Sequence, residues 1–135
     1  MRKALLLTLL LLSPFANALD QKEIKVNSSF VMSDKLMCSI VQSSNKEDVG
    51  KNLTFIGLNG NQPEVSFESD MNFPYRKLFE DERTLTLVLG QESKSGAVDS
   101  FVIDKKNGKF SRVSAGLIVI PGEGVYSIAS LGVCK

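Results

Sequence analysis

The residues of this chain that could do acid/base chemistry are mainly carboxylates, and the densest group is Glu80-Asp81-Glu82. Paired carboxylates act as general acid and base when burial separates their pKa values. Three consecutive acids in a polar segment with basic neighbours are more typical of a solvated connection, and no nucleophile or cofactor motif accompanies them. We therefore expect no catalytic residue in this run.

The chain contains no histidine. That removes the Ser-His-Asp and Cys-His arrangements, the commonest acid/base group at neutral pH and the usual zinc ligand. The glycine-containing stretch Gly57-Leu58-Asn59-Gly60 lacks the lysine and the following helix that a phosphate-binding loop needs. The sequence predicts a protein that is not an enzyme and that has no cofactor and no metal site.

Two other groups of side chains are candidates for recognition. One is an aromatic and arginine segment of the kind enriched at binding hot spots, and the other is a lysine cluster that could meet an acidic partner. Together they form the candidate binding surface: Phe73, Tyr75, Arg76, Lys105, Lys106 and Lys109. The alternative is structural, with the aromatic rings filling the end of a barrel and the lysines only solubilising a turn.

The two cysteines, Cys38 and Cys134, are expected to form a disulfide. Cysteines in an exported chain pair more often than they remain free. Cys38 alternates with Leu36 and Ile40, and Cys134 lies on the same strand face as Ile128, so both are on the more apolar face of their strands. We predict that their α-carbons lie within about 7 Å of each other.

Alternation of apolar and polar residues with a period of two dominates the rest of the chain, and clusters of Gly, Asn and Pro interrupt it. This pattern is typical of half-buried strands joined by short turns, which indicates an all-β antiparallel meander of about eight strands in a closed barrel or a sandwich. The expected strands are 23–32, 35–42, 52–58, 64–68, 84–89, 97–104, 109–114, 117–120 and 125–133.

One hairpin can be predicted to the register. A four-residue loop over residues 105–108, with Gly108 in the left-handed conformation, places Ile103 opposite Phe110 and gathers Phe101 with them on one face. A two-residue Asn107-Gly108 turn would instead set two lysines opposite each other, which is unfavourable.

Residues 73–82 are the exception to the strand pattern, and they allow one short helix. Asn72 could cap it, and Leu78 and Phe79 follow Tyr75 at the spacing of one helical turn.

The first residues resemble an export signal. Arg2 and Lys3 precede an apolar run, and Ala16-Asn17-Ala18 is a signal-peptidase pattern, so we expect cleavage of residues 1–18 and a single β domain over 19–135. The apolar run is too short to span a membrane. The product would be periplasmic or secreted, with no membrane span after cleavage. Asn27 and Asn52 match the glycosylation pattern, which carries little weight in a bacterium.

The chain has 16 Lys and Arg against 15 Asp and Glu, and the cleavage would remove two of the basic residues. A near-neutral surface argues against a nucleic-acid partner. About 117 residues suit one domain, which we expect to be monomeric.

In size, export signal, β content and cysteine use, the chain resembles the small periplasmic β-barrel proteins, a group that includes inhibitors of lysozyme. It lacks the Ser-Gly-x-x-Tyr stretch that one of those inhibitor families carries. The resemblance therefore implies an architecture and no particular activity.

Three functions remain as hypotheses. The first is an exported, non-catalytic binding module that recognises a protein or a cell-envelope component. The second is a carrier that holds a small apolar ligand inside a calycin-like barrel, which an interior without a cavity would exclude. The third, ranked last, is an enzyme that uses carboxylates.

Overall fold

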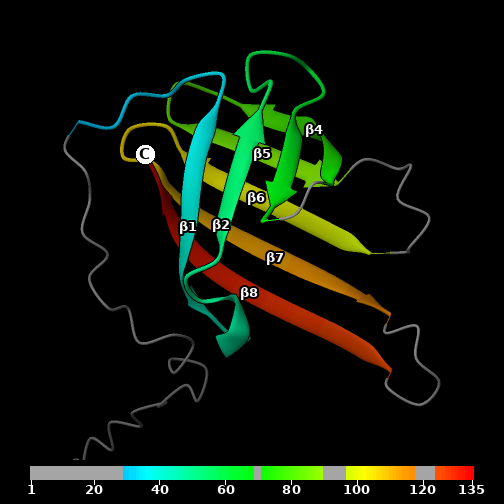
Figure 1. Cartoon of the computed structure of the whole chain (residues 1–135). Coiled ribbons are helices and arrows are strands. Elements are labelled where there is room, and N and C mark those ends of the chain that lie inside the picture. The colour runs from blue at the N-terminus through cyan, green and yellow to red at the C-terminus, as the bar shows by residue number, and fades with distance from the viewer. Residues whose placement is uncertain (1–28, 69–70, 90–96, 118–123) are drawn as a thin grey trace, which may run out of the picture.

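The structure, a computed structural model, describes residues 29–68, 71–89, 97–117 and 124–135. These residues form eight antiparallel strands, each paired with the next, and the last strand pairs with the first to close a barrel (Figure 1). The strands are β1 Leu36–Ser43, β2 Asn52–Ile56, β3 Glu64–Phe67, β4 Asn72–Glu80, β5 Thr84–Leu89, β6 Val98–Asp104, β7 Lys109–Leu117 and β8 Val125–Cys134. One short 3-10 helix, η1 Lys46–Asp48, lies between β1 and β2.

The barrel, rather than the sandwich, follows from the pairing of β1 with β8, which leaves no free edge in the eight-strand order. Away from the register shifts in β1 and β4, alternate side chains point inward, as the period of two predicted. Interior positions are filled by Leu, Ile, Val and aromatic residues, with Phe55 and Phe101 in edge-to-face contact at 5.0 Å between ring centroids.

The meander order gives the barrel two distinct ends. At one end β1, β3, β5 and β7 finish and β2, β4, β6 and β8 begin, and η1 lies there; we call it the η1 end. At the other, the disulfide end, are the turns at 57–63, 81–83 and 105–108 and the C-terminal residues (Figure 1). Phe30 covers Gly108 at the disulfide end, where a Cβ on that glycine would lie 2.6 Å from the Phe30 ring.

The predicted disulfide is confirmed. Cys38 on β1 is the direct cross-strand partner of Cys134 on β8, and their α-carbons are 3.9 Å apart. Both residues are buried with the apolar core. The bond therefore joins the two strands that close the barrel.

The predicted hairpin register is also confirmed. Ile103 pairs with Phe110, and Gly108 has φ +70° and donates its backbone N–H to the carbonyl of Asp104 at 2.9 Å. Phe101 shares the interior face with both, as the register requires.

The helix expected near 73–82 is wrong, because this segment is strand β4. It pairs with β3 on one side and β5 on the other, and a helix there would leave both edges unpaired and the barrel open. Tyr75 points inward while Leu78 and Phe79 are exposed, so the three residues do not share the face that a helix would bury. A register shift between Lys77 and Phe79 inserts one extra residue, a β-bulge, and this insertion disturbs the alternation.

Two other boundaries differ. Separate strands were expected at 109–114 and 117–120, but β7 runs without a break from Lys109 to Leu117. Residues 118–120 lie outside the described ranges. Gly116 is no break, because it pairs with Tyr126, whose ring would lie 3.0 Å from a Cβ at that position. Of the strand expected at 23–32, residues 23–28 are outside the described ranges and 29–32 are not in a strand.

Among the described residues, no helix is long and apolar enough to cross a membrane.

Candidate functional site

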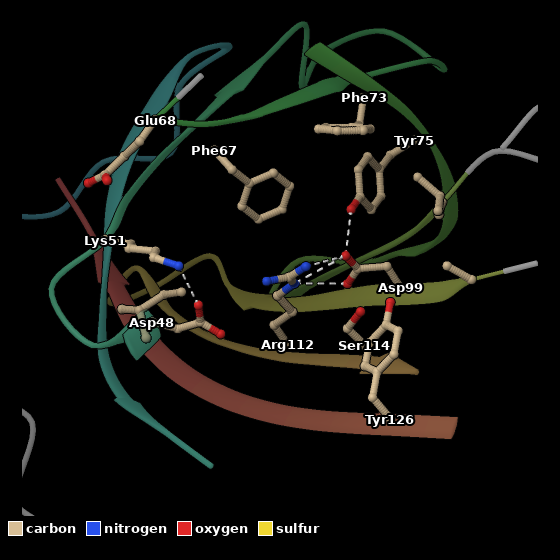
Figure 2. Close-up of a pocket in the computed structure, with 13 residues that line it drawn as sticks. Asp48, Lys51, Phe67, Glu68, Phe73, Tyr75, Asp99, Arg112, Ser114 and Tyr126 are labelled. Atoms are coloured by element: carbon tan, nitrogen blue, oxygen red, sulfur yellow. Dashed lines mark hydrogen bonds and ion pairs between the residues drawn. The ribbon is translucent and has the colours of Figure 1, made fainter. Parts of the chain in front are cut away.

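A cavity of about 520 Å³ occupies the η1 end of the barrel (Figure 2). Its apolar wall contains four aromatic rings and three aliphatic side chains: Phe67, Phe73, Tyr75, Tyr126, Ile40, Leu89 and Ala97. Its polar wall consists of Asp48, Lys51, Glu68, Asp99, Arg112 and Ser114. The buried residues Phe101, Phe55 and Phe110 pack against one another in the barrel towards the disulfide end.

The central polar feature is an ion pair between Arg112 on β7 and Asp99 on β6. Arg112 donates Nε–H to Asp99 Oδ1 at 3.0 Å and Nη2–H to Oδ2 at 2.6 Å. The Asp99 side chain is 7% exposed and the Arg112 side chain 15% exposed. Two contacts of this kind fix the orientation of the guanidinium as well as its charge.

Tyr75 on β4 completes a network of three side chains. Its hydroxyl donates to Asp99 Oδ2 at 3.0 Å, from the other side of the carboxylate (Figure 2). Burial raises the pKa of the Tyr75 phenol far above its usual value, and the charge of Asp99 and the hydrogen bond raise it further. Tyr75 therefore stays protonated and remains a donor to Asp99 over the whole physiological range.

The Arg112 guanidinium lies over two aromatic rings. Its Cζ lies 4.4 Å from the centroid of the Phe67 ring and 5.6 Å from that of Phe101. Burial by itself would lower the pKa of Arg112, but the hydrogen bonds and charge of Asp99 outweigh it and raise that pKa. Arg112 is thus a fixed, permanently charged donor inside a largely apolar wall.

Part of this donor is unused. A guanidinium has five N–H groups, and the bonds to Asp99 come from Nε and Nη2 only. Nη1 has no hydrogen-bond partner among the described residues, and Figure 2 shows the guanidinium projecting into the cavity, between Asp99 on one side and Lys51 on the other. The edge away from Asp99 is available to a bound molecule.

Ser114 is a second polar group with capacity for a ligand. It pairs with Asp99 across the β6–β7 ladder and is only 4% exposed, yet its hydroxyl has no hydrogen-bond partner in the part of the chain that the structure describes. The residue lines the cavity, and its Oγ is accessible from it.

A second ion pair lies at the edge of the cavity. Lys51 Nζ is 2.7 Å from Asp48 Oδ1. Asp48 is the last residue of η1, which Asn45 caps by accepting a hydrogen bond from the backbone N–H of Glu47. The hydrogen bond with Asp48 raises the pKa of Lys51, and the charges of Glu47 and Glu68 add to it. Glu68 itself accepts the backbone N–H of Asn52 at 2.7 Å.

The six residues of the candidate binding surface do not form one surface. Phe73 and Tyr75 line the cavity. Tyr75 is buried, which agrees with the structural alternative, in which the aromatic rings fill one end of the barrel. Arg76 points outward on β4, beside Val88. The three lysines at 105, 106 and 109 lie at the disulfide end, which is the far end from the cavity.

Lys105 and the acidic run stabilise a turn. Lys105 Nζ contacts Glu80 Oε1 at 3.0 Å and donates to the Asp81 carbonyl at 2.8 Å. The Asp81 carboxylate accepts the backbone N–H groups of Arg83 and Thr84. Glu80 and Asp81 therefore have a structural role in this turn.

The sequence reasoning missed Asp99, Arg112, Ser114 and Tyr126. A signal was present: each lies on the interior face of its strand, where an apolar residue is expected, and Asp99 and Arg112 have opposite charges on neighbouring strands. Oppositely charged residues on the interior faces of adjacent strands indicate a buried pair.

Within the described ranges, no group of three or more Cys, Asp or Glu residues could hold a metal ion. Comparison of the chain with protein-family models, with curated proteins and with solved structures finds no match.

Proposed function

We propose that this protein is an exported, non-catalytic binding protein that holds a small, largely apolar molecule in the cavity at the η1 end of its barrel. The observation that carries the proposal is the cavity itself, about 520 Å³ with four aromatic rings in its wall and a fixed guanidinium inside it. Between the binding hypotheses raised by the sequence, this favours the ligand carrier over the recognition of a protein.

The size and lining of the cavity support a small organic ligand. Pockets for such ligands measure roughly 300–1,000 Å³ and combine a mostly apolar wall with a few fixed polar groups. Here the polar groups are held before any ligand arrives, since Asp99, Tyr75 and the ring of Phe67 together fix Arg112. Groups fixed in advance lose little entropy when a ligand binds.

The bonding of the buried carboxylate supports a non-catalytic role. Asp99 accepts hydrogen bonds from Arg112 on both oxygens and from the Tyr75 hydroxyl on Oδ2. The oxygens of this carboxylate are thus engaged in holding Arg112 and Tyr75, and we take its contribution to be the positioning of Arg112.

Export is part of the proposal. It rests on the signal-like residues 1–18 and is consistent with the Cys38–Cys134 disulfide, which would persist in an oxidising compartment. N-terminal sequencing of the protein recovered from an exporting host tests this, with Leu19 as the expected first residue. A recovered protein that begins at Met1 would contradict it.

The ligand proposal can be tested with N-phenyl-1-naphthylamine, an uncharged apolar probe whose fluorescence rises in an apolar site. We expect a saturable increase with one site per chain. Two neighbouring residues offer matched variants: Ala97 lines the cavity, whereas Val98 points outward and is 67% exposed. Ala97→Phe should fill the cavity and abolish the signal, and Val98→Phe should leave it unchanged.

No saturable increase with the wild-type chain would contradict the proposal. So would equal loss of binding in both variants, because that would mean binding outside the cavity.

Recognition of a protein partner remains a second candidate, and one observation favours it. The β-bulge in β4 turns two apolar side chains outward, Leu78 at 63% and Phe79 at 52% exposure. Affinity capture from envelope extract, with the wild type and the Leu78→Ser/Phe79→Ser variant in parallel, tests it. A partner retained by the wild type and lost with the variant would support this candidate; the same proteins retained by both would refute it.

A further inference from the structure

We infer that the molecule held in the cavity is uncharged and carries a carbonyl-type acceptor oxygen, which binds the free edge of Arg112. The inference rests on the proposed ligand-binding function and specifies the polar end of the ligand. Two independent features lead to it: the hydrogen bonds that the cavity leaves unmade, and the balance of its charges.

The unused N–H groups of Arg112 can be satisfied only by a hydrogen-bond acceptor on the ligand. Arg112 has only donors, and its Nη1 edge has no partner among the described residues while Asp99 occupies the Nε side. The N–H groups of a guanidinium lie in its plane, so a ligand satisfies this donor by approaching in that plane. The Phe67 ring lies beside the guanidinium, 4.4 Å from Cζ to the ring centroid. A planar group with an acceptor oxygen fits that approach, and its apolar remainder would contact the aromatic wall.

Ser114 adds a second contact. A hydroxyl in a residue that is 4% exposed costs free energy unless it is hydrogen-bonded, and no described residue bonds to it. In Figure 2 it lies on the Asp99 side of the cavity together with Tyr126, away from the free edge of Arg112. A ligand that spans the cavity could bond to Arg112 at one point and to Ser114 at another.

The charge balance argues against an anionic ligand. Both cations in the wall already have a carboxylate partner, Arg112 with Asp99 at 2.6 Å and Lys51 with Asp48 at 2.7 Å. The third acid in the wall, Glu68, bonds to a backbone N–H and has no ion-pair partner among the described residues, so the wall carries a net charge of minus one. An anion would lose its hydration without gaining an uncompensated positive charge.

An uncharged carbonyl avoids that cost and still receives a strong hydrogen bond. A bond from a charged donor is worth about 10-fold or more in binding. A ligand of the same size without an acceptor binds more weakly, because the N–H groups of Arg112 lose water without a replacement. Asp99 and Tyr75 act here as positioning residues, since they hold the guanidinium so that its free edge points into the cavity.

Three aromatic probes of matched size test the inference: 2-naphthamide and 2-acetylnaphthalene, which are uncharged, and 2-naphthoate, which is an anion at pH 7. They share one ring system and the same number of non-hydrogen atoms. Each competes with N-phenyl-1-naphthylamine for the disulfide-bonded wild-type chain. We expect both uncharged compounds to compete at concentrations at least about 10-fold lower than naphthoate.

Two variants locate the contact. Arg112→Lys keeps a cation for Asp99 but removes the second edge of the guanidinium, so it should weaken the two uncharged carbonyl probes about 10-fold. Ser114→Ala should weaken naphthamide severalfold without a loss of thermal stability, since the hydroxyl makes no bond to a described residue. Val98→Phe is the matched control outside the cavity.

The outcomes separate this inference from the proposed function. Tightest binding of naphthoate would assign an anionic ligand and overturn the inference, while the carrier proposal would stand. Equal binding of all three probes would also overturn it. Failure of N-phenyl-1-naphthylamine itself to bind would refute the proposed function, and the inference with it. The ratio of amide to acid affinity is measured on the wild type, so the test holds even if Arg112→Lys fails to fold.

Discussion

Arg112 and Asp99 are 13 residues apart in the chain and meet inside the barrel, with Arg112 Nη2 2.6 Å from Asp99 Oδ2. Adjacent strands bring them together, since Arg112 pairs with Phe101 and Asp99 with Ser114 in the β6–β7 ladder. The pair gives the cavity a fixed donor, and it also places two charges where most barrels of this size have apolar side chains.

Asp99→Asn should destabilise the fold by about 3 kcal/mol, because it leaves the charge of Arg112 buried without a counter-charge. Arg83→Gln is the comparison, since it breaks the Arg83–Asp104 pair, in which the arginine side chain is 66% exposed. That change should cost less than about 1 kcal/mol. Urea unfolding at pH 7 measures the free energy of unfolding of both variants. A loss below about 1 kcal/mol for Asp99→Asn, similar to that of Arg83→Gln, would contradict the prediction.

Stability should fall as the pH rises above about 10. The pKa of Tyr75 is raised in the folded state, from the unfolded value of 10.0. The folded chain therefore keeps a proton that the unfolded chain releases above pH 10, and alkali favours unfolding. Tyr75→Phe should lose the hydrogen bond to Asp99, about 1.5–3 kcal/mol at pH 7, and show a shallower decline between about pH 10 and 12. Equal slopes for the two chains would contradict the assignment.

At low pH, Asp81 should contribute to acid sensitivity. The backbone N–H groups of Thr84 and Arg83 lower the pKa of its carboxyl from the ordinary 3.8. A lowered pKa gives stability that is complete above the unfolded value and is lost as the pH falls through the folded value. Asp81→Asn keeps an acceptor for the turn but does not titrate, so its free energy of unfolding should change less between about pH 4 and 2. An unchanged acid profile in urea unfolding would refute this role.

The disulfide should be a large part of the stability of the domain. It closes a loop with a sequence separation of 96, which corresponds to about 4–5 kcal/mol in the chain-entropy model. Cys38→Ala/Cys134→Ala should lower the free energy of unfolding by about that amount, less any structure retained in the unfolded chain. A thiol assay on the unreduced, denatured protein should find no free thiol, and two titratable thiols would contradict the bond.

The disulfide, and the strands in which apolar and polar residues alternate without interruption, could be predicted from the sequence. Thr84–Leu89 matches its prediction, and the Cys38–Cys134 pair followed from two cysteines on the apolar faces of an early and a late strand. Strand β4 was missed because its bulge interrupts the alternation and brings Leu78 and Phe79 to a helical spacing after Tyr75. A bulge is set by pairing with a neighbouring strand, which one segment of sequence does not contain.

The candidate site could be predicted only in part from the sequence. The predicted pairing of Ile103 with Phe110, continued along the hairpin, already places Arg112 opposite Phe101 and Ser114 opposite Asp99 on the interior face. The cavity itself could not be predicted, because its volume depends on side chains contributed by every strand except β2. Phe73 and Tyr75 were chosen for their residue types, and they reach the cavity from a strand that was taken for a possible helix.

The most direct test of the central claim is chemical-shift mapping of the 15N-labelled chain during titration with 2-naphthamide. The account predicts saturable shifts for residues around the cavity, such as Phe67, Ala97 and Ser114, and none for Lys106 or Val133 at the disulfide end. Shifts confined to the disulfide end or to Leu78 and Phe79 on the outside of β4, or the absence of any saturable shift, would contradict a ligand site inside the barrel.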